Sequence, residues 1–542
     1  MEFNAADIFE GVVKRIPERE ALILGDTRLT YQDLNDRADK MAVALRNIGV
    51  SKGSHIGIYA FNCIEWIEIM LAAYKLCAIP ININYRYVED ELIYLIDNAD
   101  ITHLFYQKAF EQLVTNIKPK LPLLSRCISM DASGEEDCLD VNIQNILDDS
   151  QEQLFSPPER SGDDKYILYT GGTTGYPKGV VWRMEDVLMT LGGGIDPISG
   201  HKYQTPEEFA DKSLQPQINA LALAPLMHGA AQWQTFNAFF SGWKLVLNDQ
   251  KSFDPNHVWD LVEKEKIMNL TITGDGMGRP LSDALLKSEN KFKDLSSLFI
   301  LTSTASILST SIKETFLSAL ENLIIIDAVG ASETGATGVN MITKDSNLTG
   351  LEKRPRFSKA TYSAILHPDN LVKIDPTDTE TIGYLARTGN VPIEYYKDPE
   401  KSKKTFVNIE GVRYSLPGDM AKYEENGEIT LLGRGSISIN SGGEKIFPEE
   451  VEIALKSHPN IFDCLVVGLP HETWGESVAA VIQSRDQKSI DLAEIKDALK
   501  TQIASYKHPK EIFFSEMIER SPSGKPNYDW AKGVALKLRN ES

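Results

Sequence analysis

The stretch YTGGTTGYPKGV, residues 169–180, combines four glycines and three threonines with one lysine. Glycines let a loop bring its backbone N–H groups against an anion, and hydroxyls and an ammonium group add further donors. The preceding KYILY, residues 165–169, is typical of a buried strand. We therefore predict a phosphate-binding loop just past a strand end, and a Gly/Thr-rich surface turn is the alternative. The residues expected to contact phosphate are Thr170, Gly171, Gly172, Thr173, Thr174, Gly175 and Lys178.

The composition is typical of a large globular protein. The chain has 542 residues, 42% hydrophobic and 25% charged, which is too long for one ordinary core. The net charge of −21 argues against a nucleic-acid partner. None of the five cysteines forms a Cys-x-x-Cys pair, and the histidines lack metal-ligand spacing. No signal-peptide pattern and no long apolar run occur, so we expect a cytoplasmic protein without stable membrane insertion.

Strand-like and helix-like segments alternate from the start of the chain. HIGIYA, residues 55–60, is expected to be a buried strand, followed by an amphipathic helix over 64–78, a strand over 79–83 and a helix over 88–98. LALAPLM, residues 221–227, is a further expected strand. This rhythm predicts an α/β fold with largely parallel sheets.

Two changes in the pattern of predicted secondary structure indicate the domain organisation. Short strands separated by turn-rich segments predict a small β-rich subdomain over residues 355–433. After it, helix and strand patterns predict a compact α+β tail. We therefore expect a large N-terminal domain over residues 1–433, which includes this subdomain, and a small mobile C-terminal domain over residues 434–542.

Five further segments follow the glycine-rich loop in a fixed order. They are PLMHG (225–229), DAVGASETG (327–335), GDM (418–420), GRGSISINSGGEKIFPEEVE (433–452) and SPSGKPNYD (521–529). In this order they resemble the motifs of the adenylate-forming superfamily, which comprises acyl-CoA synthetases, peptide-synthetase adenylation domains and firefly-type luciferases. The resemblance covers residues 20–530, essentially the whole chain. YTGGTTGYPKGVVWRMED, residues 169–186, is similar to bacterial fatty-acyl and sterol side-chain CoA ligases.

The resemblance implies that a carboxylic acid and ATP react to acyl-AMP and pyrophosphate. Such a reaction depends on positioning and positive charge rather than on a protein nucleophile. Lys525 would bridge the carboxylate and the α-phosphate, although a lysine near a C-terminus is ordinarily solvated. His228 would lie between the acid and the approaching thiol, where a structural histidine is the alternative reading. Glu333 would act in catalysis by holding Mg²⁺, together with Thr173.

The same resemblance implies the remaining nucleotide contacts. Asp419 would accept hydrogen bonds from both ribose hydroxyls, Arg434 would reach ribose and phosphate, and Ser332 would bond the α-phosphate. Further residues implied at the nucleotide are Thr304 and Asp327.

A second set of implied residues concerns CoA, the acyl acceptor. The turn Ser441, Gly442 and Gly443 would approach its pantetheine arm once the C-terminal domain rotates about a hinge at Ser436. The family usually has aspartate at this hinge and an aromatic residue where this chain has Val329. We expect both departures to be tolerated.

Small residues predict the kind of acid. The expected wall of the acyl pocket is Gly229, Ala230, Gly274, Gly276, Val329 and Gly330. Small side chains leave volume, and no lysine or arginine lies in these stretches to pair a second carboxylate. Asp275 is the one charge, and we expect it to cap a helix. The prediction is a monocarboxylate with a sizeable apolar body, such as a medium- or long-chain fatty acid or a steroid side-chain acid.

These observations predict an AMP-forming acyl-CoA synthetase that uses ATP, Mg²⁺ and CoA. One alternative is an acyl-AMP ligase that passes the adenylate to a carrier protein or another acceptor. Another, of a different class, is a catalytically silent nucleotide-binding protein with the same fold. The sequence does not decide the oligomeric state, and a homodimer is compatible with it.

Overall fold

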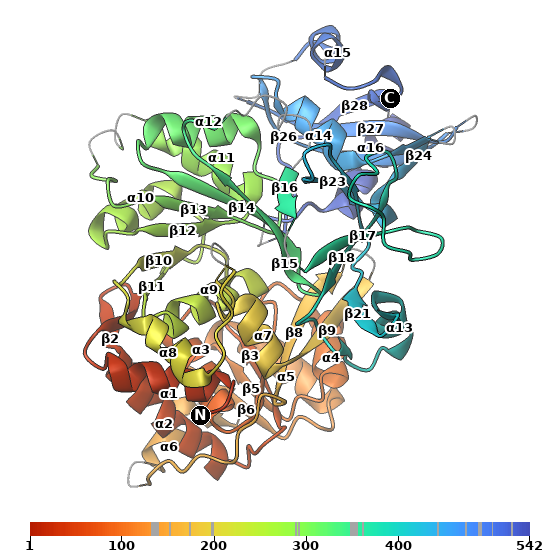
Figure 1. The fold of residues 1–542 in the computed structure, drawn as a ribbon. Coiled ribbons are helices and arrows are strands. Elements are labelled where there is room, and N and C mark those ends of the chain that lie inside the picture. Colours follow the sequence, from red (N-terminus) through yellow and green to blue (C-terminus); the bar gives the residue numbers. More distant parts are fainter. Residues whose placement is uncertain are drawn as a thin grey trace.

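A computed structural model gives the structure of the chain. It describes residues 1–541 except 132–139, 151–152, 173–174, 197–199, 288–289, 291–292, 347–355, 360–361, 442–443, 472–473, 486–489, 501 and 522–523. Helices cover parallel sheets in the first two thirds of the chain, and the C-terminal elements, drawn in blue, lie beside the green helices α11 and α12 (Figure 1). The α/β class predicted from the sequence is confirmed.

A five-stranded parallel sheet forms near the N-terminus, with the order β4-β3-β5-β6-β7. Its strands are β3 (His55–Tyr59), β4 (Ile79–Asn82), β5 (His103–Tyr106), β6 (Arg126–Ser129) and β7 (Val141–Asn142). The helices of this region are α1 (Ala5–Arg15), α2 (Tyr31–Asn47), α3 (Ile64–Lys75), α4 (Glu89–Asn98), α5 (Glu111–Ile117) and α6 (Ile143–Asp148). Strands β4 and β5 are buried at every position, as strands of a parallel sheet covered on both faces usually are, and this includes their polar residues Asn82 and His103. Helix α3 ends earlier than the predicted residue 78, and Cys77 then adopts a positive φ of 56° that a helix cannot contain.

The second parallel arrangement runs β1-β11-β10-β12-β13-β14 within a larger sheet. The elements here are β1 (Glu20–Leu24), β2 (Thr27–Thr30), β10 (Asn219–Ala222), β11 (Lys244–Leu247), β12 (Asn269–Ile272), β13 (Ile300–Ser303), β14 (Ile324–Ala331), α7 (Met184–Leu191), α8 (Pro206–Asp211), α9 (Gly229–Phe240), α10 (Pro255–Lys264), α11 (Gly274–Leu285) and α12 (Thr310–Ala319). The strand predicted over 221–227 ends at Ala222, before Pro225, which has no N–H to donate to a ladder.

An antiparallel region continues the large sheet; it begins at residue 335 and runs through residues 355–433, where the β-rich subdomain is predicted. Its strands are β15 (Gly335–Ile342), β16 (Arg356–Lys359), β17 (Ser363–Leu366), β18 (Gly383–Thr388), β20 (Phe406–Ile409), β21 (Val412–Ser415), β22 (Asp419–Tyr423) and β23 (Ile429–Arg434). A separate small sheet joins β8 (Lys165–Gly172), β9 (Gly175–Arg183) and β19 (Glu394–Tyr395), and α13 (Pro399–Thr405) follows it. Through these strands, segments that are far apart in the sequence meet around β14 and β15.

The C-terminal segment has its own sheet and cores. Its elements are β24 (Ile439–Ser441), β25 (Glu444–Ile446), β26 (Ile461–His471), β27 (Gly475–Ser484), β28 (Glu511–Phe514), α14 (Pro448–Lys456), α15 (Leu492–Lys500) and α16 (Tyr528–Glu541). Two clusters of buried apolar residues lie entirely within this segment, one on each face of β26 and β27. Such self-contained cores are what a segment needs to move as a unit.

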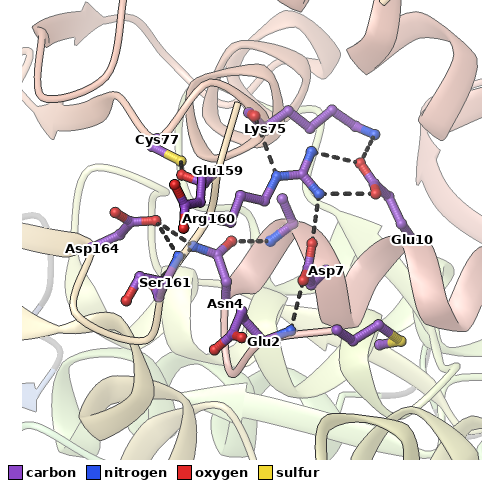
Figure 2. Close-up of polar contacts among 12 residues, drawn as sticks. Glu2, Asn4, Asp7, Glu10, Lys75, Cys77, Glu159, Arg160, Ser161 and Asp164 are labelled. Atoms are coloured by element: carbon purple, nitrogen blue, oxygen red, sulfur yellow. Dashed lines mark hydrogen bonds and ion pairs between the residues drawn. The ribbon is translucent and has the colours of Figure 1, made fainter. Parts of the chain in front are cut away.

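A buried ionic network fixes the connector that leads into β8 (Figure 2). The guanidinium of Arg160 donates to Asp7 at 2.7 Å and to both carboxylate oxygens of Glu10 at 2.9 Å. Lys75, whose side chain is 1% exposed, donates to the same Glu10 at 2.7 Å. Asn4 donates to Asp164, the residue before β8. Helix α1 therefore holds the start of the strand that carries the glycine-rich loop.

Candidate active site

The glycine-rich stretch forms a β-hairpin rather than a loop beyond a single strand. Strands β8 and β9 pair antiparallel, with Thr170 opposite Lys178 and Gly172 opposite Gly175. Thr173 and Thr174, which come between the two strands in the sequence, lie outside the described residues. Gly179 is required here, because a Cβ at this position would lie 2.7 Å from the Tyr169 ring. The predicted phosphate ligands Thr170, Gly172, Gly175 and Lys178 are thus carried on two paired strands.

Lys178 has a partner that its motif did not reveal. Its Nζ atom donates to Asp398 Oδ2 at 2.6 Å and lies 5.8 Å from the centre of the Tyr395 ring. Asp398 also caps α13 by accepting from the backbone N–H of Lys401. Lys178, which is expected to contact phosphate, is therefore engaged in an ion pair in this structure. No local spacing links residue 178 with residue 398, so no sequence pattern could have revealed the pair.

The turn between β14 and β15 is fixed by three other elements. Trp182 of β9 donates to the carbonyl of Ser332 at 3.1 Å, and Ser415 of β21 donates to the carbonyl of Glu333 at 2.6 Å. Tyr395 of β19 donates to Glu333 Oε1 at 2.8 Å, and burial together with this carboxylate raises the pKa of the tyrosine. Tyr395 is a site residue that sequence reasoning missed.

Asp419 and Arg434 face each other on neighbouring strands. They are register partners of β22 and β23, and Arg434 Nε lies 3.3 Å from Asp419 Oδ1. Burial raises the pKa of Asp419, and Arg434 opposes that shift. Burial also acts against the charge of Arg434, but Asp419 and Glu333 outweigh it and raise the pKa of the guanidinium. The two side chains form one coupled pair beside Glu333.

Lys525 joins this pair from the C-terminal segment. Its backbone N–H donates to Ser521 Oγ at 3.0 Å, which closes a tight turn. The side chain is exposed to solvent, yet the surrounding protein and the like charge of Arg434 lower the pKa of its ammonium, while Glu333 and Asp419 act in the opposite direction. The lysine therefore lies within electrostatic reach of all three charged residues.

His228 belongs to the same group. Burial, with smaller contributions from the positive charges of Lys525 and Arg86, lowers the pKa of His228 to about 3. The imidazole is therefore neutral near pH 7. Its buried Nε2 has no hydrogen-bond partner among the described residues, which is uncommon for a buried polar atom and fits a ligand-binding position.

Other predicted residues lie apart from this group in the contacts that the structure describes. Asp327 forms a buried ion pair with Lys313 of α12 at 2.6 Å. The backbone N–H of Thr304 donates to Ile272 at the end of β12. Ser436 lies in a short 3-10 helix directly after Arg434, at the predicted hinge. Ser441 ends β24 in the C-terminal sheet, and Gly442 and Gly443 lie outside the described residues.

The glycines predicted to line the acyl pocket have backbone roles instead. Gly274 has a φ of 52°, and a Cβ there would lie 2.5 Å from the carbonyl oxygen of Ile307. A Cβ on Gly330 would lie 2.3 Å from the carbonyl oxygen of Gly335 in its own hairpin. Gly276 faces Gly524, whose Cα would be 3.2 Å from a Cβ on Gly276. These three positions do not provide open volume for an acid in this structure.

The rest of that predicted wall packs on apolar neighbours. Ala230 packs against the main core, and Val329 against the core of the β-rich region. A Cβ on Gly229 would lie 2.7 Å from both Leu168 and Trp233. Asp275, expected to cap a helix, lies in the first turn of α11 but accepts from the backbone and hydroxyl of Ser309.

Two absences hold for the part of the chain that the structure describes. No three histidine, cysteine, aspartate or glutamate side chains there are grouped so as to hold a metal ion. No helix among these residues has the length and apolar character needed to cross a membrane.

Comparisons with known proteins identify the family and the fold. Residues 9–381 match the model of the AMP-binding enzyme family, and residues 450–525 match the AMP-binding enzyme C-terminal domain. The 3-oxocholest-4-en-26-oate–CoA ligase of Rhodococcus rhodochrous is 42% identical, with 98% of this chain and 96% of the relative covered. The medium/long-chain-fatty-acid–CoA/3-oxocholest-4-en-26-oate–CoA ligase of Mycobacterium tuberculosis is 42% identical, covering 98% and 95%. The crystal structure of the anthranilate CoA ligase AuaEII with anthranoyl-AMP superposes with a TM-score of 0.84 at 21% identity, covering 99% and 98%.

Proposed function

The chain belongs to the AMP-binding enzyme family, and we propose that it is an AMP-forming ligase that joins a carboxylic acid with a large apolar body to CoA. The carboxylate oxygen attacks the α-phosphorus of ATP and pyrophosphate leaves. The thiol of CoA then attacks the acyl carbon and AMP leaves. Relatives named as ligases for medium- and long-chain fatty acids and for a steroid side-chain acid support this choice of acid.

The convergence of Lys525 with Glu333, Asp419 and Arg434 is the observation that carries the proposal. Two anions must approach each other in the first step, and negative charge collects around phosphorus. Cations fixed at that point lower the barrier because they need no reorganisation as the charge develops. Lys525 and Arg434 are suited to this role. A silent binding protein would have no need to keep an exposed cation at this point.

Glu333 is the residue we assign to Mg²⁺. Tyr395 occupies one of its carboxylate oxygens, and the other has no hydrogen-bond partner among the described residues. A single carboxylate fits Mg²⁺, which retains several waters and is commonly bound with substrate phosphates rather than in an all-protein cage. When bound, the ion would neutralise charge on the phosphates. Tyr395 orients the carboxylate, and Thr173 stays a predicted second ligand.

CoA is the proposed acceptor, and it requires a second orientation of residues 434–542. In the structure the segment presents Lys525, while Ser441 lies in the C-terminal sheet and contacts none of the four charged residues in the described contacts. Rotation at Ser436 would exchange the lysine for the turn that follows Ser441. The separate cores of the segment support its movement as a unit. Transfer of the adenylate to a carrier protein is the second candidate.

Pyrophosphate release and thioester formation test the proposal. The acids to compare are dodecanoate, 3-oxocholest-4-en-26-oate, acetate and succinate, each with and without CoA. We expect turnover with the first two acids and an acyl-CoA product only when CoA is present. Pyrophosphate release with no thioester would favour the carrier-protein reading. Highest activity on acetate or succinate would contradict the proposed acid.

A further inference from the structure

Helix α11 lies beside the C-terminal segment (Figure 1) and forms an ionic contact with it that none of the motifs contains. Asp275, in the first turn of α11, lies 3.3 Å from Nζ of Lys456, the last residue of α14. The two side chains are 4% and 7% exposed, so water screens the pair little. Although burial alone would raise the pKa of Asp275, Lys456 and Arg279 hold it below its ordinary value.

The contact continues from Lys456 to the turn that carries Lys525. Lys456 Nζ lies 3.4 Å from Asp463 Oδ1, and Arg520 donates to both oxygens of Asp463 at 2.6 and 2.8 Å. The same guanidinium donates to the carbonyl of Gly524 at 3.1 Å. Gly524 directly precedes Lys525. A chain of buried charges thus leads from α11 to the backbone of the lysine turn.

The turn itself rests on the start of α11. Gly524 has a φ of 73°, and a Cβ there would lie 2.8 Å from Thr273 Oγ1 and 2.9 Å from the Thr273 carbonyl. Gly276 faces Gly524 and the aliphatic stem of Arg520. Only glycines allow the two segments to approach this closely. The ion pair and the glycine contact therefore act on the same relative position of the two parts of the chain.

We propose that the Asp275–Lys456 pair is an interdomain latch that positions Lys525 for acyl-adenylate formation and that opens before thioester formation. The inference rests on the proposed function, since it assigns the latch to one of its two half-reactions. Asp275 and Lys456 are positioning residues because they reach the reacting atoms only through the lysine turn.

The surroundings of the pair make its opening feasible. Separating a buried pair usually leaves uncompensated charges, at a high cost. Here each charge keeps partners on its own side: Asp275 retains two hydrogen bonds from Ser309, and Lys456 retains Asp463. The latch can therefore favour one orientation without making the other inaccessible.

The test separates the two half-reactions. Lys456→Met keeps the apolar stem and removes the charge, and Asp275→Asn keeps a near-identical shape. Arg485→Gln is the matched control, because Arg485 and Asp283 form an interdomain pair at 3.0 Å whose side chains are 31% and 38% exposed, far more than those of the latch pair. The assays are dodecanoate-dependent exchange of labelled pyrophosphate into ATP, and dodecanoyl-CoA formation from supplied dodecanoyl-AMP. Hydrogen–deuterium exchange of peptides around Thr273 and Lys525 is measured in parallel.

We expect each latch variant to lower pyrophosphate exchange by about tenfold or more, because the pair no longer favours the orientation that presents Lys525. Thioester formation from dodecanoyl-AMP should stay within about twofold, which also shows that the variants fold. The double variant should lose little more than either single one, since both remove the same interaction. Deuterium uptake around Thr273 and Lys525 should increase in the latch variants and not in Arg485→Gln.

Equal losses in both half-reactions, additive losses in the double variant, or unchanged deuterium uptake would overturn the latch. If the unsubstituted chain exchanged no pyrophosphate with any acid, the proposed function would fail. Deuterium uptake would still decide whether the pair holds the segment in place.

Discussion

Replacing Lys525 with alanine should separate the two half-reactions more sharply than any other single change. The side chain is exposed and is not part of a packed core, so the fold should persist. What the variant loses is one positive charge within electrostatic reach of Glu333, Asp419 and Arg434. The remaining guanidinium of Arg434 is already paired with Asp419 at 3.3 Å and cannot replace the missing ammonium.

The expected loss follows from the environment of this charge. A preorganised cation or hydrogen-bond donor at a developing anion typically contributes about 10²–10³ in rate, or about 2.7–4 kcal/mol. Lys525 lies within electrostatic reach of Glu333, Asp419 and Arg434, so it can act as such a cation. We therefore expect acyl-adenylate formation by Lys525→Ala to fall by about 10²–10³-fold.

The assay compares that loss with thioester formation from supplied acyl-AMP. In the second half-reaction the rotated segment would carry Lys525 away, so its removal should change that rate by less than about threefold. A double-label experiment, with pyrophosphate exchange and acyl-CoA formation measured on the same preparation, excludes differences in folded fraction. Losses of equal size in the two half-reactions would refute the rotation of the segment.

The lowered pKa of Lys525 adds a pH signature. Only the protonated ammonium carries the required charge, so adenylate formation should decline as the pH rises through this lowered pKa. A lysine with the ordinary pKa of about 10.4 would remain active to higher pH. Lys525→Arg should flatten this alkaline limb, whatever its absolute rate, because a guanidinium is not deprotonated in proteins. An unchanged alkaline limb would assign the titration to another group.

Three further predictions concern the metal, a glycine and the N-terminal network. Glu333→Gln should raise the Mg²⁺ concentration needed for adenylate formation, because the amide loses the charge that binds the ion; an unchanged magnesium titration would exclude Glu333 as ligand. Gly274→Ala should lower the free energy of unfolding by about 1–3 kcal/mol, given its φ of 52°, and an unchanged urea midpoint would contradict this. Arg160→Met should cost about 3–5 kcal/mol in the same urea experiment; a loss below about 1 kcal/mol would show that the network is not stabilising.

The fold and several site residues could be predicted because their signals are local. Alternating strand and helix patterns depend on side-chain periodicity, which survives in any tertiary context. Lys525, Glu333 and Asp419 occur in short motifs whose order matches a known family. These three residues could therefore be assigned to one site from the order of the motifs, without any distance between them.

What could not be predicted depends on contacts between distant segments. Gly274 and Gly276 read as open volume in the sequence, but backbone atoms of other segments occupy the space beside them. The partner of Asp275 could not be predicted either, because Lys456 lies 181 residues further along the chain. The sequence does not distinguish a glycine that leaves space for a ligand from a glycine that allows two segments to pack closely. Only the residue that lies beside the glycine in the folded chain distinguishes the two roles.

The network around Arg160 has a consequence for the order of folding. Glu10 and Arg160 are 150 residues apart, so their pairing closes a long loop, and the entropy lost on closing it opposes formation of the pair. Until the connector arrives, Lys75 is the cation that compensates Glu10, and Asp7 lacks the guanidinium that it has in the native chain. During synthesis, α1 can therefore complete its packing only after residue 160 has emerged from the ribosome. Helix α1 also packs on α8 and α9, so the first sheet would stay incompletely packed on this side until those helices have been made as well.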